Sequence, residues 1–237
     1  MTNLCCNAWQ HYSWVLLLPS YLLILLIILI GIKTLNAIHS IFLFIISLLI
    51  AATCEWISLT LFPFDGHIFS SQLGPKIGVI PIVVWLAWPF LIFLCFMATE
   101  FLFFQIKRKA SLALKSILDG LWALSMDLLI DPIQQFEKNW YWPGGGMLFG
   151  VPILNFLGWM GVVGLTTYLF RLFLQKRKSV LQLDGIGYTL IAVFVIIYVF
   201  FLYSTFYWGL WQAALLSMLV LLVGILIFIS TSHPSRH

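Results

Sequence analysis

Long apolar stretches follow one another along this chain, and they constrain its fold more than any other feature. Crossing a bilayer as a helix takes about 20 consecutive apolar residues. The chain is 62% hydrophobic and only 8% charged, a composition far from that of soluble domains. We therefore predict an all-α, polytopic integral membrane bundle, a single transmembrane domain over residues 1–237 with about seven transmembrane helices. The predicted helices cover residues 13–32, 38–58, 79–104, 112–131, 150–173, 185–207 and 209–230, with a turn near Trp208 between the last two.

The basic residues are distributed asymmetrically. With seven helices, every Lys and Arg except Lys76 and Lys138 falls on one side of the membrane. Because cytoplasmic loops carry the excess of positive charge, we expect the N-terminus outside and the C-terminus in the cytoplasm, in the cell membrane. The membrane topology explains this distribution of positive charge, so we expect no nucleic-acid partner. Apart from Trp122, the tryptophans gather in the outer half, which predicts an aromatic-lined site there.

Two outer loops precede related sequences. GVIPIVVWLAW (Gly78–Trp88) and GVPILNFLGW (Gly150–Trp159) share four features counted from the proline of each. These are Ile at +1, Leu at +5, a small residue at +6 and Trp at +7. The match predicts a weak hairpin repeat over residues 38–104 and 112–173, and such repeats often place a site between them. Chance similarity between helices that begin at proline is the alternative.

Three polar side chains on three predicted helices should lie at one depth. At a rise of about 1.5 Å per residue, Asp127 lies roughly 6 Å inside its helix end, and Glu55 and Asn155 lie about one turn inside theirs. An ionised carboxylate in mid-membrane costs about 2.5–3.5 kcal/mol, so such groups face the bundle interior. Burial and a neighbouring carboxylate favour the protonated form, which a general acid requires. We therefore expect Asp127 and Glu55 to be catalytic.

Other interpretations exist for these groups. Asp131 is a candidate catalytic residue, but it precedes a proline and also fits the N-cap of a short interfacial helix over residues 132–139. Glu55 fits a position among lipid headgroups. Asn155 fits a hydrogen bond between helices that has no catalytic role.

Two further acids, Glu100 and Asp119, lie near the cytoplasmic side. We expect them to form structural ion pairs with Lys115 or Lys107. The polar groups of a site are thus expected in the outer half alone, which argues against a transport path through the bundle.

The loop after Asp131 combines aromatic residues with Gly144–Gly146. These glycines are expected to let the loop fold tightly over the helix ends. Aromatic faces can line a slot for a flat ligand and stabilise a cation, although interfacial anchoring is the alternative for each ring. The candidate substrate-binding residues are Asn155, Trp159, Trp140, Trp142, Phe64 and Phe149. The histidines form no HxxH or HxxxH pair, and we expect no metal and no cofactor.

Two blocks of sequence carry a resemblance to a known family. One is Glu55 with PFDGHIFSSQLGPKIGVIPIVVWLAW (Pro63–Trp88). The other is Asp127–Trp159, with the elements D-x-x-x-D-P, W-x-W, F-G-V-P and N-F-x-G-W. Together they resemble the carotenoid biosynthesis membrane family that includes the carotenoid 1,2-hydratases, such as the γ-carotene 1'-hydroxylases and bisanhydrobacterioruberin hydratases.

The resemblance implies a cofactor-independent hydro-lyase that takes a lipophilic polyene or other isoprenoid from the bilayer. An acid among Asp127, Asp131 and Glu55 would protonate a terminal double bond of an acyclic end group, and water would capture the tertiary carbocation. A membrane terpenoid or carotenoid cyclase, which starts with the same protonation, is one alternative. A non-enzymatic small transporter or lipid-binding membrane protein is another.

Overall fold

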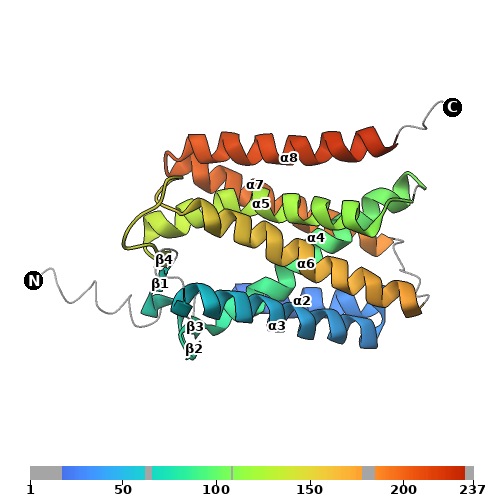
Figure 1. Ribbon diagram of the computed structural model, residues 1–237, viewed down its shortest axis with the longest axis horizontal. Helices are drawn as coiled ribbons and strands as arrows, with labels where there is room; N and C mark the ends of the chain where they lie inside the picture. Colours follow the sequence, from blue (N-terminus) through green and yellow to red (C-terminus); the bar gives the residue numbers. More distant parts are fainter. Residues whose placement is uncertain (1–17, 62–65, 108, 178–184, 233–237) are drawn as a thin grey trace, which may run out of the picture.

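The computed structural model describes residues 18–61, 66–107, 109–177 and 185–232, and most of these residues are helical (Figure 1). Seven long helices lie side by side in the described part of the chain. They are α2 (Leu18–Leu35), α3 (Ala37–Leu61), α4 (Ile82–Gln105), α5 (Leu112–Glu137), α6 (Ile153–Arg177), α7 (Gly185–Tyr207) and α8 (Trp211–Ser232). These confirm the all-α prediction, and the break between α7 and α8 falls at Gly209, where φ is 73°.

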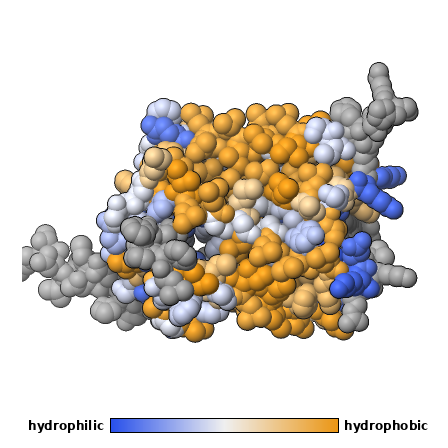
Figure 2. All heavy atoms as spheres, viewed as in Figure 1, coloured by the Kyte–Doolittle hydropathy of each residue, from blue (hydrophilic) through white to orange (hydrophobic). Residues whose placement is uncertain are grey.

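The surface of the bundle suits a membrane. By length and composition, α3, α4, α6, α7 and α8 can each cross a bilayer. Figure 2 shows apolar surface over the middle of one face and hydrophilic residues gathered toward its two ends. The charged residues Lys115, Asp119 and Asp127 keep α5 outside this class. A membrane protein is thus supported, while seven crossings and the orientation of the termini stay predictions.

Helix α5 carries the most acidic residues and lies at the centre of the bundle. It packs chiefly against α6 and α8 and also touches α4 and α7. Asp119, Asp127 and Asp131 are at most 1% exposed. These three acids therefore face the protein interior, as the cost of a carboxylate in lipid requires.

The interpretation of Asp131 as the N-cap of a separate interfacial helix is wrong. Helix α5 continues through Pro132 and ends at Glu137, followed by Lys138 in the left-handed conformation. Pro132 removes one helical N–H, but the hydrogen bonds of the surrounding turns hold the helix together. Asp131 thus lies within the helix, and its side chain is available for tertiary contacts.

Two loops meet at the end of the bundle where α3 and α5 end and α4 and α6 begin (left in Figure 1). Strand β1 (Ile68–Phe69) pairs antiparallel with β4 (Trp140–Tyr141), with Phe69 opposite Trp140. The first loop also holds the 3-10 helix η2 (Ser71–Leu73) and the hairpin of β2 (Lys76–Ile77) with β3 (Ile80–Pro81). This pairing brings the two blocks of the resemblance together.

The glycines of the second loop allow a tight turn, as expected. Gly145 has a φ of 65°. A Cβ on Gly146 would lie 2.1 Å from the carbonyl carbon of Val151, far inside van der Waals contact. The chain therefore needs glycine there to return over the start of α6.

Candidate active site

The end of the bundle covered by the two loops contains a cavity of about 360 Å³. Residues of α3, α4, α5, α6, α7 and both loops line it. Its polar lining includes Glu55, His67, Gln72, Asp131, Gln134 and Asn155. Its aromatic lining consists of Phe69, Trp88, Trp140, Trp142, Trp159 and Phe201. A few polar groups converging in a mostly apolar hollow are typical of a small-molecule site.

Asp131 is the carboxyl of α5 that lines this cavity. Its Oδ1 accepts a hydrogen bond from the indole Nε1 of Trp140 at 3.1 Å, and its Oδ2 accepts one from the side-chain amide of Asn155. The β1–β4 pairing positions Trp140, and the first turn of α6 positions Asn155. The carboxyl is therefore held from two sides and keeps one orientation toward the cavity.

Asp127 lies one helical turn before Asp131 and is 0% exposed. It does not line the cavity, but its carboxyl interacts with that of Asp131. Two carboxyls close together in a buried site favour a proton on one of them, because ionising both is costly. The two acids therefore form a buried pair beside the cavity wall.

Glu55 and His67 form a second polar pair on the cavity wall. His67 Nε2 lies 2.9 Å from Glu55 Oε1. The imidazole packs edge-on against Phe69 and tilted against Trp142, with ring centroids 4.6 Å and 5.3 Å away. Two acids and one base thus surround the same space.

Sequence reasoning missed His67. The histidine pattern bears on metal binding alone, and His67 has no histidine at ligand spacing. A signal was present, because His67 lies in the loop that immediately follows the helix of Glu55. Among the described residues, no group of three or more His, Cys, Asp or Glu is arranged to hold a metal ion.

The expected site residues divide into three groups. Glu55, Asp131, Asn155, Trp140, Trp142 and Trp159 line the cavity. Asp127 lies behind its wall, and Phe149, partly exposed in the second loop, does not line it. Phe64 falls outside the described residues. The roles of all these residues stay predictions.

The two tryptophans at +7 of the proposed repeat meet in the cavity wall. The rings of Trp88 and Trp159 lie 4.5 Å apart between centroids, tilted by 38°. Val84 and Asn155, at +3, also line the cavity. The two hairpins thus contribute equivalent positions to one hollow, and the repeat itself stays a prediction.

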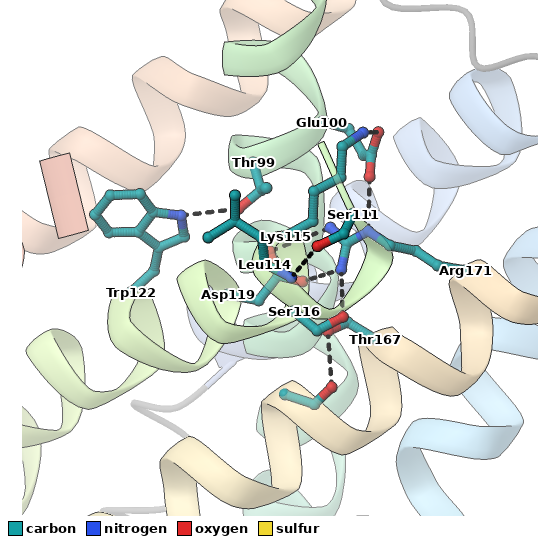
Figure 3. A network of polar contacts seen from close by, with 11 residues as sticks. Thr99, Glu100, Ser111, Leu114, Lys115, Ser116, Asp119, Trp122, Thr167 and Arg171 are labelled. Carbon is teal, nitrogen blue, oxygen red and sulfur yellow. Dashed lines mark hydrogen bonds and ion pairs between the residues drawn. The ribbon is translucent and has the colours of Figure 1, made fainter. Parts of the chain in front are cut away.

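A second buried polar cluster lies toward the opposite ends of α4, α5 and α6 (Figure 3). Glu100 accepts from Lys115 Nζ and from Arg171 Nε, each at 2.7 Å. Arg171 also pairs with Asp119 and donates to Ser116 Oγ at 3.1 Å. Two acids and two bases balance within this network, which ties three helices together.

This network confirms one expectation and adds a partner to it. Glu100 is paired with Lys115 as predicted, but its second partner is Arg171, which charge counting assigned to a surface group. The network adds polar groups to the half of the bundle opposite the cavity, where structural ion pairs are expected. The cluster is closed by its own ion pairs, however, so it is a structural contact rather than a binding site.

Comparison with known proteins gives one match. A family model described as "Carotenoid biosynthesis protein" matches residues 12–224 of the 237-residue chain. No curated protein and no solved structure matches the chain.

Proposed function

Because the chain belongs to the carotenoid biosynthesis protein family, we propose that it is a carotenoid 1,2-hydratase that adds water to a terminal double bond of an acyclic end group. One observation carries the proposal. The Asp127–Asp131 pair and the Glu55–His67 pair lie around one aromatic cavity. Hydration of an alkene needs these two functions, a proton donor and a group that takes a proton from water.

The acid pair supplies the first step. Asp131 lines the cavity, so the proton passes from its carboxyl to C2 of the end group and forms a new C–H bond. The π electrons of the C1=C2 bond form that bond, and C1 becomes a tertiary carbocation. Asp127 positions Asp131 and shares the proton with it. Trp140 and Asn155 stabilise the carboxylate that remains after transfer.

The aromatic wall shelters the cation. The face of an aromatic ring attracts a positive charge, by about 0.5–2 kcal/mol per ring depending on desolvation. Trp88, Trp159, Trp140 and Trp142 surround the cavity. These rings offer no strong nucleophile, so the cation survives until water reaches it.

The Glu55–His67 pair completes the reaction. A water molecule held by this pair attacks C1 through an oxygen lone pair, and the C–O bond forms. The excess proton of that water passes to the pair, and a proton returned to Asp131 restores the starting state. The product is a tertiary alcohol. The sum is alkene plus water, with no oxidation or reduction of the substrate.

The substrate fits the surroundings of the site. A volume of about 360 Å³ is at the low end for ligand pockets, which suits the end group of a long apolar molecule rather than the whole of it. A carotenoid dissolves in the bilayer, and helices long and apolar enough to cross a membrane form the cavity walls.

The test is expression in cells that make lycopene, followed by mass analysis of the pigments. The expected product is heavier than lycopene by the mass of one or two water molecules, one for each end group that is hydrated. A product of unchanged mass identifies a cyclase, and unchanged lycopene contradicts both reactions. Asp131→Asn is the inactive comparison, and Glu137→Gln, an exposed acid of the same helix, is the matched control.

A further inference from the structure

Three hollows lie in a row where α3 faces α4 and the β2–β3 hairpin. The first is the active-site cavity. The last is an open apolar groove of about 520 Å³ along α3. Between them lies a small pocket of about 10 Å³. The groove is lined by Ile45, Leu49, Thr53, Trp56, Ile77 and Val79, together with the residues that it shares with the small pocket.

Shared walls join the three hollows. Glu55 and Trp88 line both the cavity and the small pocket. Ala52, Ile80 and Trp85 line both the small pocket and the groove. The groove is therefore separated from the cavity by a partition that consists of these residues around the small pocket.

Trp85 is the large side chain on the groove side of this partition. Its indole Nε1 is buried and has no hydrogen-bond partner among the described residues. A buried donor is normally paired, so this ring is not anchored by its polar atom. Rotation of Trp85 would open the partition without breaking a hydrogen bond.

The size of the cavity requires a second binding region. If the protein hydrates carotenoids, as proposed above, the cavity receives the end group and the rest of the polyene must lie elsewhere. The groove is apolar, and the side chains of Leu49, Trp56 and Ile77 in its wall are more than half exposed. We propose that the groove between α3 and the β2–β3 hairpin binds the polyene tail and that the substrate enters the cavity past Trp85.

A second groove supplies a matched comparison. About 440 Å³ in volume, it lies between α5 and α6 and is also apolar and open. It shares no lining residue with the cavity. A Cβ on Gly161 in this groove would meet no atom within 4 Å, so a side chain added there starts in open space.

The experiment measures bound lycopene rather than turnover. The full chain carrying Asp131→Asn is purified in lipid nanodiscs from lycopene-producing cells, and bound lycopene is quantified by absorbance. Adding Ala52→Trp, which fills the groove beside the partition, is expected to lower bound lycopene about tenfold, whereas Gly161→Trp leaves it unchanged. Thr53→Trp fills the groove from an exposed position. It provides a second test of the groove in case the Ala52→Trp protein does not fold.

The outcomes separate this proposal from the proposed function. Equal lycopene in the Ala52→Trp and Gly161→Trp proteins, as expected of a groove filled by lipid alone, overturns the groove assignment and leaves hydration untouched. Absence of bound lycopene from the Asp131→Asn protein also overturns the groove assignment. A third outcome is possible, in which the unmutated chain hydrates no carotenoid and yet Ala52→Trp and Thr53→Trp each remove the bound lycopene. In that case the proposed hydration is wrong, and the groove remains a polyene-binding site.

Discussion

The side-chain amide of Asn155 on α6 donates a hydrogen bond to the carboxylate of Asp131 on α5. The contact joins the two helices that pack most extensively in the bundle. With Trp140 donating to the other oxygen, the acid is fixed before any substrate arrives. A group held in this way spends little free energy on reorganisation when charge develops. The same contact makes Asp131 the starting point for testing the mechanism.

Replacing Asp131 by Asn should remove the proton donor while keeping the shape of the side chain. We expect hydration to fall by about 10²–10⁴-fold, the usual contribution of a general acid. Pigment mass analysis checks this, with Glu137→Gln expected to retain activity. Full activity in Asp131→Asn together with its loss in Asp127→Asn would transfer the donor role to Asp127.

The Glu55–His67 pair should act as one unit. His67→Gln and Glu55→Gln are each expected to lower hydration by about 10²-fold, because either change leaves water without its proton acceptor. The double variant should be little worse than either single variant, since residues in direct contact are not additive. The measurement is initial rate in isolated membranes. Losses that multiply would show that the two residues act independently.

Trp159 should contribute to stabilising the cation. Trp159→Leu is expected to lower the rate by roughly 2- to 30-fold, corresponding to about 0.5–2 kcal/mol for one cation–aromatic contact. Trp159→Phe should lose less, because an aromatic face remains. Trp211→Leu, at a half-exposed tryptophan of α8, is the control. Equal losses for Leu and Phe would mean that ring size, rather than ring electrons, matters.

The distant ion network should control stability rather than chemistry. Arg171→Met leaves Glu100 and Asp119 buried without their shared cation, so we expect a loss of about 3–5 kcal/mol in the free energy of unfolding. Thermal denaturation in detergent measures this, with Lys176→Met, an exposed base of the same helix, as control. A stable Arg171→Met protein that loses activity would give the network a direct functional role.

Some of the site was accessible from sequence because its physical signals are local. An acid in an apolar helix is costly wherever that helix packs, so Glu55, Asp127 and Asp131 were identifiable as anomalies. The sequence did not show which of Asp127 and Asp131 faces the cavity. They lie one turn apart on one face of α5, and only Trp140 and Asn155 show which of them meets the cavity.

The sequence by itself determined the helices, their approximate ends and the membrane class, since these depend on the length of apolar stretches and on the cost of exposing polar groups to lipid. The tertiary structure alone decided the partners. His67 meets Glu55 through a loop that pairs with another loop, and Arg171 meets Glu100 across 71 residues. Such contacts depend on how each helix is rotated against its neighbours, and a uniformly apolar sequence records that rotation only weakly because most of its faces are equally suited to burial.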